Sequence, residues 1–196
     1  MKLRNVLKNI IKSLINRYNY IINSITLNTH HIIRGQNLHI NGMLIIRGTG
    51  LSFGNDVRIN SGKRFNIIGG DRQSTFIMRK GAFIIIGNNV GISNSTFVAH
   101  EKIIIEDNVM IGGGCKIYDT DFHSLNFEER MEEPDTNIRK SPVHIKTGAF
   151  IGAHSIILKG VVIGKKSVIG AGSVVTKNIP DNQIWAGNPA KFIKNL

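Results

Sequence analysis

The chain has 196 residues, with 25 Lys and Arg against 13 Asp and Glu, and a formal net charge of +12. This charge is spread along the chain without the aromatic and basic alternation of single-strand binders, so we expect no nucleic acid partner. The single cysteine, Cys115, excludes a disulfide framework within the chain, and no uncharged apolar run approaches the roughly 18 residues of a membrane span. A secretory leader pattern is also absent, so we expect a cytoplasmic protein.

Residues 1–28 have the pattern of a basic amphipathic helix. Apolar side chains recur there at helical spacing: Leu3, Val6, Leu7, Ile10, Ile11, Leu14, Ile15 and Tyr18. Cations occupy other positions, and no acid is present: Lys2, Arg4, Lys8, Lys12 and Arg17. Such a helix either lies on an anionic membrane, peripheral to its inner face, or packs on the rest of the protein or on a sister subunit. The pattern leaves both interpretations open.

Residues 29–183 carry a repeat of six residues that is clearest after Val143. One column is aliphatic: Ile145, Ile151, Ile157, Ile163, Ile169 and Val175. A second column, four residues after the first, is mostly small or β-branched: Ala149, Ser155, Val161, Ser167, Ser173 and Ile179. Neither the helical period of 3.6 nor the strand period of 2 produces this spacing. A fixed short repeat predicts a parallel β-helix of short strands and tight turns, with both columns facing inward.

The same spacing extends upstream with interruptions. It includes Ile86, Ile92 and Val98, then Ile105, Ile111 and Ile117, and earlier Ile40 and Ile46 followed by Phe53, Ile59 and Phe65. Between residues 66 and 85 the pattern sets no register. Residues 184–196, which follow Pro180, are expected to cap the open end, first as a strand and then as a helix. Cys115 falls at a small inward position, so we do not expect it to be a nucleophile.

The repeat is broken once by a long insertion, residues 118–142. A solenoid accepts an insertion by extruding it as a loop, and such loops often carry function. The loop contains His123, with Asp119 and Asp121 beside it in the sequence. An imidazole oriented by a carboxylate is suited to remove a proton from a hydroxyl. The acid that orients His123 is left open by the sequence.

Two segments resemble the hexapeptide-repeat acyltransferases, and most closely the galactoside, maltose and polysaccharide O-acetyltransferases. They are Ile163-Gly-Lys-Lys-Ser-Val-Ile-Gly-Ala-Gly-Ser-Val-Val-Thr-Lys-Asn-Ile-Pro180 and Ala186-Gly-Asn-Pro-Ala-Lys191. The resemblance extends from about residue 84 to the end of the chain. It implies that the parallel β-helix is left-handed. We therefore expect a mainly β protein, a left-handed parallel β-helix with an N-terminal amphipathic helix and a protruding loop. The resemblance also implies acetyl-CoA as co-substrate, no metal, and a homotrimer with sites between neighbouring subunits.

The resemblance also assigns residues. It makes His123 the catalytic base and Asn94 a contact of the acceptor. The family's acceptor-binding acid has no clear match, and we expect Asp121, beside His123, to contact the acceptor. The resemblance places the acetyl-CoA contacts on six residues: Ala153, Ala171, Thr176, Lys177, Lys191 and Lys194. Short side chains let the thin pantetheine chain lie close to a β wall, and lysines supply positive charge for phosphates.

We therefore expect an acetyl-CoA-dependent O-acetyltransferase that acts on a sugar hydroxyl, in the synthesis of a bacterial surface polysaccharide such as a capsule, O-antigen or exopolysaccharide. An N-acetyltransferase acting on an amino sugar or a nucleotide-linked sugar is the nearest alternative. A metalloenzyme of the γ-carbonic anhydrase kind would need three converging histidines, and no closely spaced pair occurs among His100, His123, His144 and His154. A non-catalytic scaffold would not need the two segments that carry the resemblance.

Overall fold

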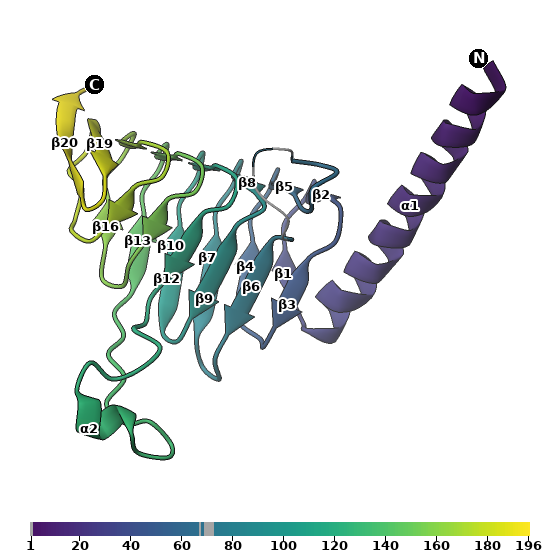
Figure 1. The fold of residues 1–196 in the computed structure, drawn as a ribbon. Coiled ribbons are helices and arrows are strands. Elements are labelled where there is room, and N and C mark those ends of the chain that lie inside the picture. Colours follow the sequence, from purple (N-terminus) through teal and green to yellow (C-terminus); the bar gives the residue numbers. More distant parts are fainter. Residues whose placement is uncertain (1, 67, 69–72) are drawn as a thin grey trace.

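The chain is wound as a three-sided solenoid whose coils add strands to three sheets in turn (Figure 1). The structure, a computed structural model, describes residues 2–66, 68 and 73–196. We name the sheets A, B and C in the order in which a coil meets them. The three lines along which the chain turns from one sheet to the next are the A–B, B–C and C–A edges. Neighbouring strands run parallel, apart from a C-terminal hairpin in sheet B.

The strands are short in all three sheets. Sheet A contains β1 (Ile33–Arg34), β4 (Leu51–Phe53), β7 (Phe83–Ile86), β10 (Lys102–Ile105), β13 (Val143–Ile145) and β16 (Val162–Ile163). Sheet B contains β2 (His39–Asn41), β5 (Arg58–Asn60), β8 (Gly91–Ser93), β11 (Met110–Ile111), β14 (Phe150–Ile151), β17 (Val168–Ile169), β19 (Gln183–Gly187) and β20 (Ala190–Asn195). Sheet C contains β3 (Ile45–Arg47), β6 (Thr75–Met78), β9 (Thr96–Ala99), β12 (Lys116–Tyr118), β15 (Ile156–Ile157) and β18 (Val174–Val175).

The inward columns form the core of the solenoid. Ile151 pairs with Ile169 in the next coil, eighteen positions later, so a regular coil contains three six-residue units. Every member of both columns predicted after Val143 is buried. Burying one such aliphatic side chain contributes roughly 1.5–3 kcal/mol relative to leaving it exposed. The six-residue repeat is therefore the pattern of core packing.

Glycines allow the coils to stack closely at the edges. A Cβ on Gly152 would lie 2.5 Å from the backbone nitrogen of Ala171, which leaves no room for any side chain. Gly172 has a φ of +72°, where a residue with a Cβ is strained. Close approach and positive φ are the two reasons for glycine at these positions.

The six-residue pattern is wrong at two upstream positions. Phe65 lies in the turns after β5, and Phe76 of β6 takes the inward place instead. Phe97, rather than Val98, pairs with Ile117. The rings of Phe76 and Phe97 stack with centroids 4.9 Å apart. The excursion between β5 and β6 resets the register, and these two rings fill the column beside it.

Helix α1 (Lys2–Thr29) closes the N-terminal end of the solenoid with its last turns. The amide Nδ2 of Asn23 donates to the carbonyl of Gly42 (2.8 Å), and its Oδ1 accepts from the Leu44 amide (3.1 Å). Leu27 enters the core and is 4% exposed. These contacts cover the first coil, which has no coil beneath it. No helix within the described residues has the length and apolar character to cross a membrane.

The C-terminal cap is a β-hairpin, so the helix expected in its second half is wrong. Strand β19 pairs with β17 of the last coil, and β20 turns back antiparallel on β19. Trp185 packs against the core, and its indole edge meets the Phe192 ring at 6.2 Å. Strand β20 pairs with the backbone N–H and C=O groups along the open edge of β19, which a helix would leave unpaired.

We expect Asn23→Ala to lower the free energy of unfolding by about 1–3 kcal/mol, because a buried carbonyl and a buried N–H both lose their partner. Urea unfolding of the full chain measures this change. Asn16→Ala is the matched control, since Asn16 is an exposed asparagine of the same helix and its replacement changes helix propensity equally. Equal effects of the two substitutions would contradict the capping role of Asn23.

Candidate active site

The inserted loop leaves the solenoid at the C–A edge, where Asp119 holds its base. Asp119 is fully buried, and its carboxylate accepts three backbone N–H groups, those of His100 (2.7 Å), Glu101 (2.7 Å) and Lys102 (2.6 Å). The two arms of the loop pair next to it, through the bridge between Thr120 and Lys140. Asp119 is thus fully engaged in anchoring the loop to the coil below.

The structure pairs His123 with Asp135, an acid that the sequence did not single out. Nδ1 of His123 lies 2.9 Å from Oδ2 of Asp135. A carboxylate only accepts, so in the neutral imidazole Nδ1 carries the proton and Nε2 keeps its lone pair. The His123 side chain is 69% exposed, whereas that of Asp135 is 15% exposed. The partly buried carboxylate of Asp135 therefore orients the imidazole, and the basic Nε2 of His123 belongs to a ring that is largely open to solvent.

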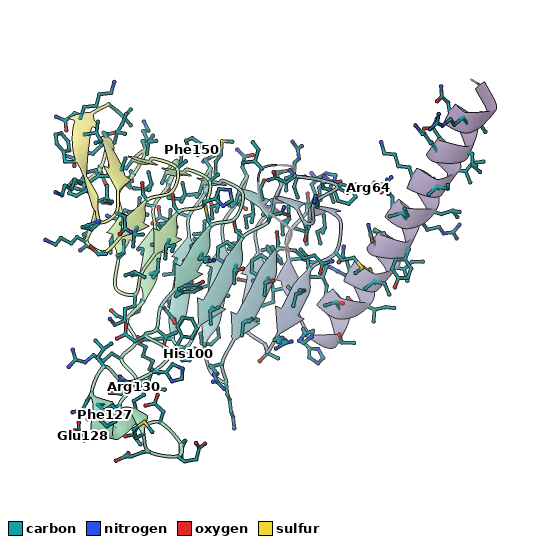
Figure 2. All side chains as sticks on the ribbon, viewed as in Figure 1. Arg64, His100, Phe127, Glu128, Arg130 and Phe150 are labelled. Atoms are coloured by element: carbon teal, nitrogen blue, oxygen red, sulfur yellow. The ribbon has the colours of Figure 1, made fainter. Side chains whose placement is uncertain are left out.

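The tip of the loop is ordered by its own hydrogen bonds. Asn126 is the N-cap of helix α2 (Phe127–Arg130), and its side chain accepts a hydrogen bond from the N–H of Glu129. Ser124 donates from its hydroxyl to Glu129 (2.6 Å) and from its backbone N–H to Asp135 (3.3 Å). Figure 2 shows the labelled side chains of this helix well away from the three sheets. The residue next to His123 is therefore tied to the same acid that orients the imidazole.

Asp121 lies in the same loop but has a different partner. Its Oδ1 is 2.9 Å from Nζ of Lys159, a residue of the next turn along the C–A edge. Its Oδ2 is buried and finds no hydrogen-bond partner within the described part of the chain. This oxygen retains the capacity to accept a proton donor. The assignment of Asp121 to acceptor binding stays a prediction.

Aromatic and basic side chains surround the base of the loop. The Phe122 ring meets Tyr118 edge-on at 5.0 Å and His100 at 6.0 Å. Burial, and then the positive charge of Arg79, lower the pKa of His100, with a smaller contribution from Lys140. His100 is consequently a neutral ring that supports Phe122, and Phe122 directly precedes the catalytic candidate.

Small residues form a column along the B–C edge. Asn94, Gly113, Ala153 and Ala171 occupy equivalent places in successive coils, linked by backbone bonds such as Gly172 N to Ala153 O (2.8 Å). At Ala153 and Ala171 only methyl groups project from this column, and glycines lie beside them, so this part of the edge is a flat wall. It suits a thin amide chain such as pantetheine, as the resemblance implies for Ala153 and Ala171.

Residues 61–66 and 68, which follow β5, belong to a second excursion of the chain and contact this wall. Asn94 is 3% exposed, and its Oδ1 accepts from the Gly62 N–H (2.6 Å) while its Nδ2 donates to the carbonyl of Asn66 (3.3 Å). Further along the wall, Nε2 of His154 lies 2.9 Å from the carbonyl of Ile68. Asn94 thus holds this excursion in place, and its role in acceptor binding stays a prediction. The only sequence signal of the excursion is the loss of register after residue 66.

A cavity of about 710 Å³ lies on the outer face of sheet B and ends at Gly112 of the B–C edge. It opens at Gly91, where a side chain would meet nothing within 4 Å. Its lining combines amides, two exposed apolar side chains and three ionisable side chains: Asn37, Asn60, Asn89 and Asn108, Met110 and Phe150, and His39, Asp56 and Arg58. A glycine inside a strand commonly marks a place where a ligand approaches the backbone.

The structure separates the predicted site residues within one chain. His123, Thr176 and Lys177 belong to the C–A edge, between sheet C and sheet A. Ala153 and Ala171 belong to the B–C edge, and Figure 2 shows Phe150, at the start of that coil's turn, on the opposite side of the solenoid from the α2 side chains.

Two further lysines lie in the C-terminal hairpin. Lys191 pairs with Ala186, whose Cβ lies against Gly170 of the B–C wall, whereas Lys194 pairs with Ile184. Lys191 thus lies near the wall, while the wall and His123 face different directions.

The remaining reactive groups have structural roles. Burial raises the pKa of the Cys115 thiol to about 11, and its Sγ lies 3.2 Å from the carbonyl of Gly152. Hydrogen bonds from Thr147 lower the pKa of Glu106, which also contacts Nε2 of His144 at 2.7 Å. Among residues 2–66, 68 and 73–196, no group of three or more His, Cys, Asp or Glu side chains is placed to hold a metal ion.

Comparisons with known proteins agree with this geometry. A family model described as the hexapeptide repeat of succinyl-transferase matches residues 102–117 and 142–177, on either side of the loop. YJL218W of Saccharomyces cerevisiae, an assigned acetyltransferase, is 35% identical over 134 residues, which cover 65% of this chain and 66% of the yeast protein. The assigned acetyltransferase SACOL2570 of Staphylococcus aureus is 45% identical over 74 residues, which cover 38% of this chain and 36% of the relative.

Two solved structures are similar in fold. The hexapeptide-repeat acetyltransferase VCA0836 of Vibrio cholerae, complexed with acetyl coenzyme A, has 30% identity and a TM-score of 0.56, and covers 62% of this chain and 64% of its own. A variant of AntD, an N-acyltransferase from Bacillus cereus, was solved with dTDP-4-amino-4,6-dideoxyglucose and coenzyme A. It has 26% identity and a TM-score of 0.69, and covers 88% of this chain and 87% of its own.

The chain carries the hexapeptide repeat and is similar to hexapeptide-repeat acetyltransferases. The predicted fold class is confirmed: a mainly β, left-handed parallel β-helix with an N-terminal helix and a protruding loop. The chain spans 66% of the yeast relative and 36% of the staphylococcal one. The two solved structures contain acetyl coenzyme A and coenzyme A respectively, in agreement with the expected co-substrate.

We expect Asp135→Asn to reduce acetyl transfer by about tenfold to a hundredfold, a part of the 10²–10⁴ that a positioned base supplies. The amide can present an N–H to Nδ1 and so favour the wrong tautomer of His123. The alkaline and acid limits of the pH profile should shift as well, which a purely structural defect would not cause. Glu128→Gln, in the same loop and exposed, is the control. An unchanged pH profile in the Asp135→Asn variant would contradict the role of Asp135 in orienting His123.

Proposed function

We propose that this hexapeptide-repeat protein transfers an acetyl group from acetyl-CoA to a sugar hydroxyl during the synthesis of a bacterial surface polysaccharide. The observation that carries the proposal is the His123 imidazole, bound at Nδ1 by Asp135 and exposed at Nε2. The flat wall of Ala153 and Ala171 supports acetyl-CoA as the donor. The amide-lined cavity over Gly91 supports a sugar, because amides pair with hydroxyl groups and Phe150 offers a ring face.

In the proposed reaction, Nε2 of His123 removes the proton of the acceptor hydroxyl as its oxygen attacks the thioester carbonyl. A backbone N–H stabilises the resulting oxyanion. The C–O bond forms, the C–S bond breaks, and the imidazolium returns its proton to the departing thiolate. Asp135 stabilises the imidazolium between these steps. No covalent enzyme intermediate is required, which agrees with the buried, high-pKa thiol of Cys115.

We expect His123→Ala to lower the turnover by about two to four orders of magnitude, as expected for the loss of a positioned base. Acetyl-CoA should still bind, because the wall that we assign to it lies on another edge. Thiol release measures the turnover, and calorimetry measures the binding. His31→Asn is the control, since His31 is exposed with a φ of +52° that asparagine tolerates. Near-normal turnover in the alanine variant would rule out His123 as the base.

We also propose a homotrimer in which each site combines His123 of one subunit with the B–C wall of its neighbour. The two elements lie on different edges of a single chain, and a cyclic assembly can bring them together in three equivalent sites. Lys191 and Lys194 of the wall subunit could contact the phosphates of CoA. Thr176 and Lys177 share an edge with His123 and would approach the same cofactor from the other subunit.

Mixed trimers test this arrangement. His123→Ala and Ala171→Trp should each be inactive alone, the second because the indole fills the exposed wall. Trimers formed by co-expressing both chains should recover about a quarter of the sites, since one interface type in four joins an intact loop to an intact wall. No recovery in trimers shown to be mixed would mean that each site is built within one chain, and a stable active monomer would exclude the trimer.

N-acylation of an amino sugar linked to a nucleotide is the second candidate. The observation that favours it is the similarity to AntD, which covers 88% of this chain. The basic side chains of Arg79 and Lys140, whose charges act on His100, could accommodate a phosphate-bearing acceptor. The stability of the product to mild base distinguishes the two, since an ester is cleaved and an amide is not. Mass spectrometry of the surface polysaccharide from cells with and without the protein tests the cellular role.

A further inference from the structure

Most of helix α1 is left uncovered by the rest of the chain. The side chains of the helix are described from Arg4 onward, and only Asn19, Asn23 and Leu27 among them are buried. In Figure 1 the helix stands at one end of the solenoid and leans away from it towards the N-terminus. Large apolar side chains along it are between 47% and 73% exposed: Val6, Leu7, Ile10, Ile11, Leu14, Tyr18, Tyr20, Ile21 and Ile25.

Six of these side chains form a continuous apolar stripe. Leu7, Leu14 and Ile21 repeat every seven residues, and Ile11, Tyr18 and Ile25 fall between them at the same interval. This alternation of three and four places all six on one face of the helix. The face differs from the one that carries Asn23 and Leu27 onto the first coil, so the cap leaves the stripe free. A contiguous apolar surface of this length marks a site of protein or membrane contact.

The charges of the helix distinguish between these two occupants. Arg4, Lys8, Lys12 and Arg17 are exposed, and residues 2–29 contain no Asp or Glu. Helices that pair along a heptad stripe usually place opposite charges beside it, whereas copies of this helix would bring only cations together. An anionic lipid surface offers apolar chains for the stripe and phosphate groups for the cations.

We propose that helix α1 is a docking element for anionic phospholipid bilayers. The helix lies in the plane of the headgroups, with its apolar stripe towards the acyl chains and its cations among the phosphates. Asn23 and Leu27 fix its C-terminal turns to the first coil, so the docked helix also sets the orientation of the solenoid at the membrane. This inference is independent of the proposed acetyl transfer, because it rests on the helix alone.

Co-sedimentation of the full chain with vesicles tests the proposal. The protein should bind vesicles made of equal parts phosphatidylglycerol and phosphatidylcholine and should not bind pure phosphatidylcholine. Binding should weaken as salt rises from low to physiological concentration, because screening reduces the attraction between cations and phosphate. Lack of binding to the anionic vesicles, or equal binding to both kinds, would overturn the proposal.

A pair of charge-matched variants separates the stripe from the net charge. Leu14→Glu and Asn9→Glu add the same charge to exposed positions on opposite faces. Leu14→Glu should weaken vesicle binding by about tenfold or more, because the stripe loses one leucine and gains a charge that resists burial. Asn9→Glu should weaken it much less. Equal loss in the two variants would mean attraction by charge without docking of the stripe, against the proposal.

The same variants show whether a second copy covers the stripe instead. Leu14 is 61% exposed, so the Leu14→Glu chain should keep the melting temperature and the oligomeric state of the original protein. The lipid proposal is wrong if the original protein does not bind anionic vesicles and the Leu14→Glu variant sediments as a smaller species or has a lower melting temperature. The stripe is then a contact between subunits.

Discussion

Backbone hydrogen bonds between successive coils are the constraint on which the other features of this protein depend. Each strand pairs with the strand one coil away, and the turns between strands pair as well, as in the bond from Gly112 N to Ile151 O (2.8 Å). Coils can stack in this way only where no side chain separates them. A Cβ on Gly112 would lie 2.6 Å from the Ala153 nitrogen. The glycines beside Ala153 and Ala171 are thus required by stacking, and they contribute to a surface suited to pantetheine.

An insertion interrupts this pairing, and buried polar side chains replace the missing bonds. Where the long loop leaves the C–A edge, three N–H groups of the coil below lose the backbone partners that a regular turn would supply. The carboxylate of Asp119 accepts all three. At the B–C edge Asn94 plays the same part for the shorter excursion. Because unpaired buried N–H groups are costly, these two side chains make the loops compatible with the solenoid.

The sequence predicted those parts of the fold that are governed by local repetition. After Val143 every coil has the same length, so the inward residues could be named individually. Upstream, the excursion between β5 and β6 shifts the register, and the spacing alone could not show that Phe76 replaces Phe65. The second strand of the C-terminal hairpin was missed because its pairing depends on the exposed edge of β17 and β19, which the local pattern does not contain. His123 was predicted as the base from the loop and the resemblance, and it stays a prediction.

Asp135 could not be found in this way. It lies twelve residues from His123, among several acids of similar spacing, and only the fold of the loop brings the two together. Ser124 and Glu129 fix the turn between them, and neither residue belongs to the repeat. The partner of His123 depends on how the loop folds locally. The spacing of acids in the sequence therefore could not identify the residue that orients the imidazole.

The continuous pairing of the coils also limits how the protein can complete a site. A solenoid bonded in register from β1 to β18 has no hinge that could carry the C–A edge towards the B–C edge of the same chain. The loop holding His123 projects away from the sheets, so it extends the separation rather than closing it (Figure 1). A reaction that uses both edges therefore needs a second chain, and the relative position of two rigid subunits sets the distance between base and thioester. In such an assembly the contacts between subunits affect catalysis directly, because they hold two halves of the active site in place.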